Sequence, residues 1–367
     1  MQRPVSRHRY HHGFSLVELM IATTLGIILT LGIAQIFAGS SRAMMDVTNA
    51  GRQIDSALYG LEMIGQDLQL AGYWGEARLP VSPAVDIFRS GETPDSAPVS
   101  YSLPPVICLG TRADPTPKTD LAYGMAFPVM GGGGAQLNAE MGASANCQLA
   151  DPVPSANSDI VVVRRAATCA SGTAGCFSFD SQFHVQTNGC VDNNLGLTGG
   201  EIKLYNSSAA LTYHRYHPTD CDSAALAPMY RYLSRVYYVD SDDRLIRLSY
   251  AASAYTAEIL VDGVERLKVE WGIDSSGDGF VDAWRAYDGA DVTPGAVGGF
   301  TPTDWQNVVG AKLWMIVRSP VKDVSFTDTA TYVLAGTTYE VPSDVLSYRR
   351  TLQSTTVDLV NVALSRR

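Results

Sequence analysis

The longest apolar run in the chain extends from Phe14 to Phe37 and contains a single charged residue, Glu18. As an α-helix this run is about 36 Å long, whereas the hydrocarbon core of a bilayer is about 30 Å thick. The pattern therefore predicts one membrane-spanning helix over residues 14–37.

After this span, apolar and small residues recur at alternating intervals of four and three, which places them on one face of a helix. This stripe consists of Val47, Gly51, Ile54, Leu58, Leu61, Gly65 and Leu68. No proline interrupts residues 5–79, and Gly72 is the expected stop. We predict one continuous helix from Phe14 to Ala71, about 87 Å long, which is long enough for a filament core. The other interpretation is that the outer half of this helix is a stalk packed on the chain's own head domain. That half can be both a stalk and part of a filament core.

Residues 72–367 show little helical periodicity and many short runs rich in Val, Ile, Tyr and Leu, which is typical of β-strands. The expected strands are Ile160–Arg165, Glu201–Tyr205, Met229–Val239, Arg244–Tyr250, Val264–Trp271 and Ala311–Arg318. Asp240–Asp243 predicts a hairpin loop, and Met130–Gly134 predicts a glycine-rich loop. We predict an α+β fold in which residues 72–367 form a head of antiparallel sheet on the outer half of the helix. Residues 90–227 are expected to be an irregular insertion in that head.

Composition and charge narrow the possible functions. The chain is 46% hydrophobic and 17% charged, as expected of a folded protein, and its formal net charge is -10. Basic residues never form a block longer than two, so we expect no binding to nucleic acid through broad electrostatic attraction. Three of the six histidines lie in the first dozen residues, and no catalytic constellation is visible. We therefore expect a protein that is not an enzyme.

The flanks of the apolar run predict its direction across a membrane. Arg3, Arg7 and Arg9 precede it, whereas only Arg42 follows it before Asp46, so the positive-inside rule places the N-terminus in the cytoplasm. A cleaved secretory signal peptide is the weaker alternative, because the run is about twice as long as an ordinary h-region. A plain signal anchor leaves Glu18 unexplained, since an intramembrane acid costs about 2.5–3.5 kcal/mol on insertion scales.

The junction between the basic leader and the apolar run carries a specific motif. Gly13 followed by Phe14, with Glu18 as the fifth residue after the junction, resembles the class III signal of type IV prepilins and pseudopilins. The resemblance implies that a prepilin peptidase cleaves between Gly13 and Phe14, removes the leader 1–13, and that the new Phe14 amine is methylated. It also implies that Glu18 pairs with the Phe14 amine of a neighbouring subunit or of its own chain.

The end of the predicted helix carries a second motif. Residues Asp67–Gly75 resemble the D-x-x-x-A-G-Y-W-G signature of PilW-like minor pilins, which are large pilins of low abundance. Further matches to that family are Tyr237–Val239, Leu245–Arg247, Gly263–Glu265, Trp271–Asp274, Trp305, Val308–Arg318, Arg349–Arg350 and Thr355–Asn361. Val360 departs from the arginine that usually stands there in the family. The resemblance implies a type IV pilin-like fold.

Six cysteines lie in the middle of the chain, and none lies in the predicted helix. Their even number in an exported domain predicts disulfides, for which neighbouring cysteines are the expected partners. The predicted pairs are Cys108 with Cys147, Cys169 with Cys176, and Cys190 with Cys221. The spacing of zinc sites is absent, and His214, His217 and Cys221 form only a loose cluster.

Residues 274–282 form an acidic loop that resembles a calcium-binding loop in its spacing. Oxygen ligands at Asp274, Ser276, Asp278 and Asp282, with the carbonyl of Phe280, match the positions that such a loop requires. Arg285 stands where the bidentate acid belongs, so Asp288 would have to complete the shell. A structural Ca²⁺ is one interpretation, and an acidic turn that needs no metal is the other.

The resemblance implies a function in pilus assembly. A PilW-like minor pilin helps to initiate type IV pilus assembly, sits at or near the tip, and supports adhesion and twitching motility. Its expected partners are the prepilin peptidase, other minor pilins, the major pilin and the inner-membrane assembly platform. Its expected location is the inner membrane with a periplasmic head, followed by the pilus surface. The alternative is a J-type minor pseudopilin of a type II secretion system, a group that is typically shorter and lacks the A-G-Y-W-G residues.

Overall fold

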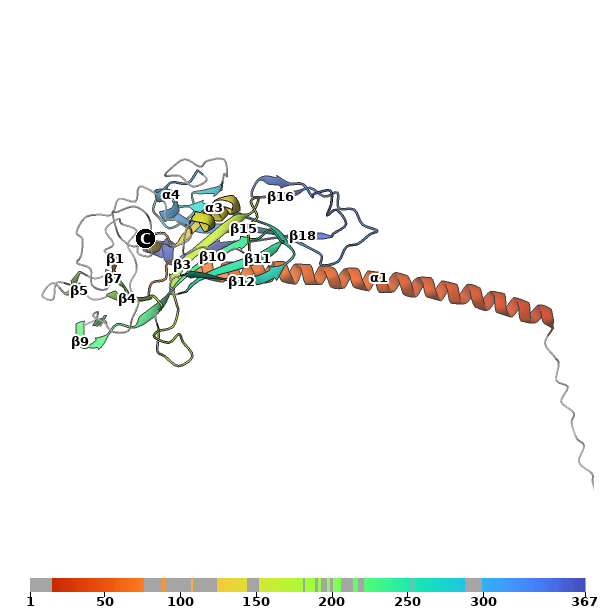
Figure 1. Ribbon diagram of the computed structural model, residues 1–367, viewed down its shortest axis with the longest axis horizontal. Coiled ribbons are helices and arrows are strands. Elements are labelled where there is room, and N and C mark those ends of the chain that lie inside the picture. The colour runs from red at the N-terminus through yellow and green to blue at the C-terminus, as the bar shows by residue number, and fades with distance from the viewer. Residues whose placement is uncertain are drawn as a thin grey trace, which may run out of the picture. The chain divides into compact units, whose positions relative to one another are not determined.

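The computed structural model describes residues 15–75, 87–89, 107, 124–143, 152–180, 182–188, 191–192, 197–198, 201–205, 214–216, 221–251, 254–287 and 299–366. The chain divides into two compact units, Met1–Arg52 and Gln53–Arg367. Helix α1, Leu16–Gln69, belongs to both units (Figure 1). Its residues up to Arg52 are the described secondary structure of the first unit, and its residues from Gln53 are the first element of the second.

The first unit is helical and apolar on its surface. Its large hydrophobic side chains, from Leu16 to Val47, are all more than half exposed. Among the described residues α1 is the one helix long and apolar enough to cross a membrane. Because apolar side chains exposed over this length are costly in water, the helix suits a lipid environment.

The part of α1 in the second unit has a buried face that differs from the predicted stripe. Its buried residues are Gln53, Ala57, Gly60, Leu61, Ile64, Gly65, Asp67 and Leu68. Ile54 and Leu58, which the stripe included, are 39% and 49% exposed. The face shifts because Gln53 donates a hydrogen bond to the Arg349 carbonyl at 2.8 Å and because Ala57 and Gly60 are small enough for close packing.

The larger sheet of the head has eight strands, and its main path runs β1-β7-β4-β10-β11-β12, with β3 also paired to β10 and β2 to β3. Its strands are β1 Ile87–Arg89, β2 Val129–Gly133, β3 Asp159–Ala166, β4 His184–Asn188, β7 Glu201–Tyr205, β10 Met229–Val239, β11 Arg244–Ala251 and β12 Ala254–Asp262. Described pairs in this sheet are antiparallel except β1 with β7.

The second sheet has four antiparallel strands in the order β14-β13-β15-β18. These are β14 Ala283–Ala286, β13 Val264–Ile273, β15 Val308–Arg318 and β18 Arg350–Asp358. Three two-stranded pairs are β16 Tyr332–Leu334 with β17 Thr337–Tyr339, β5 Val191–Asp192 with β6 Leu197–Thr198, and β8 His214–Tyr216 with β9 Cys221–Leu226. The remaining helices are α3 Gly134–Ala143, α4 Pro302–Gln306 and α5 Val360–Arg366.

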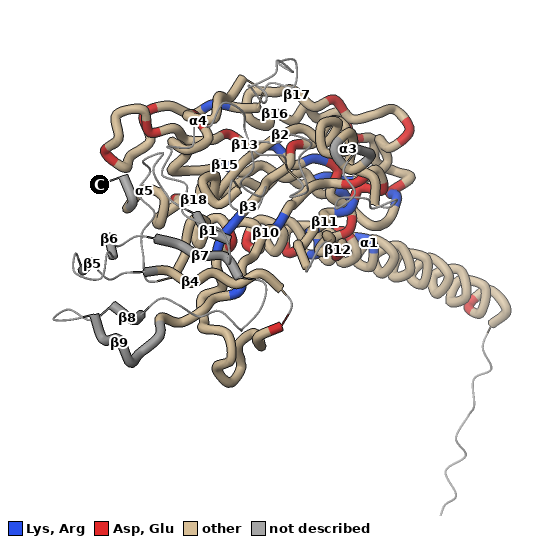
Figure 2. Tube along the Cα trace, turned by 60° about the vertical axis from the view of Figure 1, so that its left-hand side comes forward, with Lys and Arg blue, Asp and Glu red and all other residues tan. Residues whose placement is uncertain are grey.

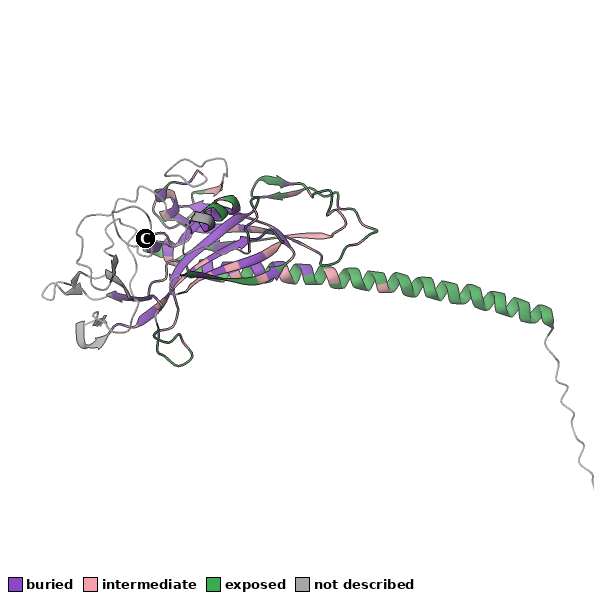
Figure 3. Cartoon of the chain, viewed as in Figure 1, coloured by how far each residue is buried: buried purple, intermediate pink, exposed green. Residues whose placement is uncertain are grey.

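One main hydrophobic core joins both sheets to α1 within the second unit. A Cβ atom at Gly60 would lie 3.1 Å from Leu245 of β11 and from Met315 of β15, and one at Gly65 would lie 3.4 Å from Val357 of β18. The helix therefore contacts strands of both sheets, and Figure 3 shows its buried residues in this part of the chain. This confirms the predicted α+β fold, with a head of mainly antiparallel sheets on the outer half of the helix.

The predicted strands agree closely with the observed ones where the local pattern is strong. β7 and β10 have the predicted bounds, and the predicted hairpin loop Asp240–Asp243 joins β10 to β11. Within the predicted irregular insertion, however, β2, β3 and β4 belong to the larger sheet. These three strands therefore contribute to the hydrophobic core of the head.

The glycine run Met130–Gly134 is not the loop that its composition predicted. Residues up to Gly133 belong to β2, and α3 begins at Gly134. A Cβ atom at Gly131 would lie 2.5 Å from Trp271 Nε1, and one at Gly133 would lie 3.1 Å from the Tyr287 ring. These glycines let the strand approach aromatic side chains closely, which is a tertiary requirement and not a turn signal.

Replacing Gly131 by Ala is therefore expected to destabilise the head by about 1–3 kcal/mol through overpacking. Trp271 is fully buried and packs edge-to-face on Trp305 at 5.5 Å, so it cannot move aside cheaply. The measurement is denaturant unfolding of the full chain in detergent, followed by tryptophan fluorescence. Gly51→Ala is the control, because nothing beyond the adjoining residues and backbone of its own helix lies within 4 Å of the added Cβ. An equal effect of the two substitutions would contradict the packing argument.

Candidate functional site

The N-terminal end of α1 places Glu18 in the first turn of the helix. Glu18 is exposed, and its Oε2 accepts a hydrogen bond from the Ser15 backbone N–H at 3.4 Å. This contact is one half of a capping box, in which an acid in the first turn satisfies a backbone donor. In Figure 2 the N-terminal stretch of α1 is almost entirely tan, which marks residues other than Lys, Arg, Asp and Glu. Gly13 and Phe14 lie outside the described residues, so the predicted pairing of Glu18 with the Phe14 amine stays a prediction.

The C-terminal end of α1 is fixed to the head by one buried carboxylate. Asp67 Oδ1 accepts from Arg165 Nη2 at 2.8 Å, and both of its oxygens accept from Arg235 Nη1 at 2.7 Å. The Tyr237 hydroxyl also donates to Asp67 Oδ2. Arg165 lies on β3, and Arg235 and Tyr237 lie on β10, so Asp67 ties the helix to two adjacent strands. Its side chain is only 4% exposed.

The electrostatics of this cluster favour the ionised form of Asp67. Burial alone would raise the pKa of Asp67, but Arg235, Arg165 and the Tyr237 hydroxyl outweigh burial and hold it below its usual value. Burial, followed by the neighbouring Asp67 carboxylate, raises the pKa of Tyr237. The cluster is therefore a carboxylate held by two guanidinium groups and a neutral phenol.

Two glycines close the turn that follows α1. Gly72 has a φ of +72°, and its N–H donates to the Arg164 carbonyl at 3.1 Å. Gly75 has a φ of +100°, and a Cβ atom there would lie 2.9 Å from the Tyr230 ring. A left-handed backbone and close contact with an aromatic ring both favour glycine at these positions.

The remaining residues of the Asp67–Gly75 motif are also packed into the head. Ala71 is fully buried, and the buried Trp74 ring stacks on Tyr232 with centroids 5.9 Å apart. Asn361 Nδ2 donates to the Gln69 carbonyl at 3.2 Å, which satisfies an acceptor at the helix end. The motif is therefore the attachment of the helix to the head. In the sequence Asp67 was only the first position of the family signature, and nothing there identified its burial or its cationic partners.

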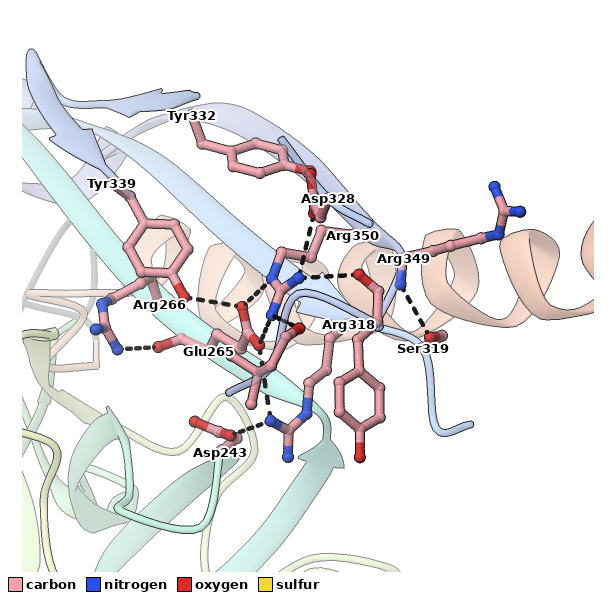
Figure 4. A network of polar contacts seen from close by, with 12 residues as sticks. Asp243, Glu265, Arg266, Arg318, Ser319, Asp328, Tyr332, Tyr339, Arg349 and Arg350 are labelled. Carbon is pink, nitrogen blue, oxygen red and sulfur yellow. Dashed lines mark hydrogen bonds and ion pairs between the residues drawn. The ribbon is translucent and has the colours of Figure 1, made fainter. Parts of the chain in front are cut away.

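A second buried network joins two segments that are far apart in the sequence (Figure 4). Arg350 donates through Nε and Nη2 to the two oxygens of Glu265, at 2.6 and 2.8 Å, and through Nη1 to Asp328 at 3.2 Å. The Arg350 side chain has no exposed surface, and those of Glu265 and Asp328 are 3% and 2% exposed. The bidentate geometry links β13 to β18, although β15 lies between them in the sheet.

Two tyrosines and a second arginine complete the network. Tyr339 donates to Glu265 at 3.1 Å and Tyr332 donates to Asp328 at 3.0 Å, so the β16–β17 hairpin is held onto the ion pairs. Burial, followed by the adjacent carboxylates, raises the pKa of both tyrosines to about 12. Arg318 pairs with Asp243 at 2.8 Å and lies 3.7 Å from Glu265. The sequence pointed to Glu265 and Arg350 separately, but nothing in it paired them.

The acidic loop does not support the calcium prediction. Asp274 accepts from the backbone N–H groups of Gly277 and Gly279 at 2.6 and 2.9 Å. Asp282 accepts from the N–H groups of Ser275 and Ser276, both at 2.8 Å. Ser275 and Ser276 donate hydrogen bonds to Asp282 through their side chains and through their backbone N–H groups. These hydrogen bonds lower the pKa of Asp282.

The other predicted ligands behave in the same way. Asp278 accepts from the Phe280 N–H at 2.9 Å, and Ser276 Oγ donates to Asp274 at 3.2 Å. The part of the chain that the structure describes contains no group of three His, Cys, Asp or Glu side chains that could hold a metal ion. Asp288 lies outside the described residues. The geometry is that of an acidic turn stabilised by its own backbone donors.

Cys169 and Cys176 form a disulfide, with Cα atoms 5.9 Å apart. This is one of the three pairs that the sequence predicted. Cys108, Cys147 and Cys190 lie outside the described residues, as does the side chain of Cys221, which stands at the start of β9. His217, of the loose cluster noted in the sequence, also lies outside them.

The apolar N-terminal helix continues into a head of mainly antiparallel sheets, as the resemblance to type IV prepilins implies. Residues 8–34 match the prokaryotic N-terminal methylation motif. Residues 236–361, which include Tyr237, Glu265 and Arg350, match the family described as Type IV Pilus-assembly protein W. These two matches, in separate parts of the chain, support a PilW-like type IV pilin. The methylation motif and the apolar helix also indicate that the chain is anchored in a membrane.

One similar solved structure is a type IV-like pilin from Thermus thermophilus, with 14% sequence identity and a TM-score of 0.24. That similarity covers 57% of this chain and 82% of the other. A search of curated protein sequences finds no significant match.

Proposed function

We propose that this chain is a minor pilin that helps to initiate type IV pilus assembly and sits at or near the pilus tip, where it supports adhesion and twitching motility. This proposal is supported by one observation: the N-terminal methylation motif and the PilW match occur on the same chain. Pilins are structural proteins, and we assign the chain no enzymatic activity. Its proposed partners are the prepilin peptidase, other minor pilins, the major pilin and the inner-membrane assembly platform.

The proposed location follows from the same features. The basic leader 1–13 lies in the cytoplasm, residues 14–37 span the inner membrane, and residues 72–367 lie in the periplasm before the chain enters the pilus. The Cys169–Cys176 disulfide supports an oxidising compartment for the head. We extend the proposal to the pairs Cys108–Cys147 and Cys190–Cys221.

Deletion of the gene, with the full chain restored in trans, tests the assembly function. Surface pili counted by electron microscopy should fall sharply and recover on complementation. Enzyme secretion into the medium, measured in the same strains, should not change. Loss of secretion with normal pili would instead assign the chain to a secretion pseudopilin. Mass spectrometry of sheared pili should find the chain far below the major subunit, and near-equal amounts would contradict a place at the tip.

Cleavage at the leader junction is expected to require Gly13. Gly13→Val should leave a longer precursor, because the residue before the cut must be small. Intact-mass spectrometry of the membrane fraction should show Phe14 at the N-terminus of the wild-type chain and Met1 at that of the variant. An intact Met1 on wild-type chain recovered from pili would contradict processing at this junction.

Substitutions of Glu18 separate charge pairing from helix capping. Glu18→Gln keeps an acceptor for the Ser15 N–H but removes the negative charge, whereas Glu18→Val removes both. If Glu18 pairs with the Phe14 amine, both variants should insert into the membrane and both should yield few pili. Immunoblots of the membrane fraction control for chain level. A normal pilus count in Glu18→Gln cells would show that capping alone is required.

A further inference from the structure

Strand β12 forms one end of the larger sheet and pairs only with β11. It is nine residues long, and six of them, from Ala254 to Asp262, are exposed, as its colour in Figure 3 shows. Tyr255 apart, no residue that the structure describes bonds to the backbone on its outer edge. An unpaired edge of this length presents a row of N–H and C=O groups to any extended chain.

A comparable edge elsewhere in the head is covered by the protein itself. β13 has no strand partner beside Leu267 and Val269 on the side away from β15. There the Ser158 hydroxyl donates to the Leu267 carbonyl at 3.2 Å and accepts from its N–H at 2.9 Å. Asp159 accepts from the Val269 N–H at 3.0 Å. The fold therefore covers one strand edge with side chains and leaves β12 without such cover among the described residues.

The side chains of β12 suit a further strand. No Lys or Pro, the residues that commonly block an edge, occurs in Ala254–Asp262. Glu258 is paired with Arg247 of β11 at 2.6 Å. Asp262, at the end of the strand, lies opposite Arg244, whose ion pairs are with Asp240 and Asp242. Ile259 is 52% exposed. Because Arg247 balances Glu258, a strand placed beside Glu258 and Ile259 would bury no unpaired charge there and would cover an aliphatic side chain.

We propose that β12 is the docking edge for an extended segment of a different pilin subunit, which adds a strand to the sheet. This inference rests on the proposed function. The partner segment is uncharged, with an aliphatic side chain opposite Ile259, because a charge there would meet an apolar surface and a balanced ion pair. A second copy of this chain is a poorer partner, since a symmetric antiparallel pair centred on Glu258 places two like charges side by side.

Site-specific photo-cross-linking in piliated cells tests the docking edge. A photoreactive residue replaces Ile259 in the full-length chain, and Val333 of β16, which is 55% exposed, is the matched control position. The expected result is an adduct between position 259 and another pilin, identified by mass spectrometry, with no such adduct from position 333. An adduct with a second copy of the chain, or no adduct from position 259, would overturn the proposal.

A pair of variants checks that strand pairing is responsible. With the photoreactive residue at Thr256, Ile259→Lys should abolish the adduct and reduce the pilus count, because a lysine blocks an edge, whereas Ile259→Thr should retain both. Equal adducts from the two variants would overturn the inference. The experiments distinguish the docking edge from the assembly function. If the adducts are missing in a strain whose pili still depend on the chain, only the docking edge is refuted. Normal pili after gene deletion refute the assembly function.

Discussion

Replacing Arg350 by Met is expected to lower the free energy of unfolding of the head by about 3–5 kcal/mol, the usual cost of removing one partner of a buried ion pair. The substitution leaves the carboxylates of Glu265 and Asp328 buried without their guanidinium partner. Burial alone would lower the pKa of Arg350, but hydrogen bonding and charge attraction from Glu265 and Asp328 outweigh burial and raise it. Arg350 is therefore positively charged near neutral pH.

The neighbouring residue provides the control for Arg350. Arg349 also pairs with a carboxylate, Asp323, at 2.8 Å, but the two side chains are 40% and 23% exposed. Arg349→Met should cost less than about 1 kcal/mol, as is typical of exposed pairs. Arg350→Lys should fall between the two, because lysine keeps the charge and loses the bidentate fork. Urea unfolding of the full chain in detergent measures all three. Equal losses for the two methionine variants would contradict the importance of burial.

Asp67→Asn is expected to detach the end of α1 from the sheet and to cost about 3–5 kcal/mol. Asparagine has nearly the same shape as aspartate but leaves Arg165 and Arg235 without a negative partner. Glu62→Gln is the matched control on the same helix, because Glu62 is exposed and its contact is a hydrogen bond from Gln66 at 3.0 Å. The control should change stability by less than about 0.5 kcal/mol, as is typical of exposed surface positions.

The pH dependence of the Asp67 variant has a definite sign. The pKa of Asp67 is lower in the folded chain than its ordinary value of about 3.9. Its contribution is therefore complete above that ordinary value and is lost as pH falls through the lowered folded value. The stability difference between the wild type and Asp67→Asn should be constant near neutral pH and should shrink below about pH 4. A difference that grows on acidification would contradict a lowered pKa.

Much of the fold was determined by short-range pattern. The apolar run of α1 was readable because it is long and continuous, and the strands β7 and β10 because short runs rich in β-branched, aromatic and aliphatic residues favour strands. The Gly13–Glu18 and Asp67–Gly75 motifs were equally local, and they pointed to the pilin family before any contact was known. Local pattern could not show why the second motif is needed, since its residues meet β3 and β10 in the folded head.

Only the tertiary structure decided which distant residues meet. Gly131 lies in a strand because the Trp271 ring occupies the space of a side chain, and Arg350 finds Glu265 across β15. The acidic loop shows the same limit, because its spacing fitted calcium while its carboxylates bond to nearby backbone N–H groups. A sequence specifies donors, acceptors and volumes position by position. Which donors pair with which acceptors, and which side-chain volumes fit together, depends on contacts between residues far apart in the sequence. Those contacts form only when the whole head packs.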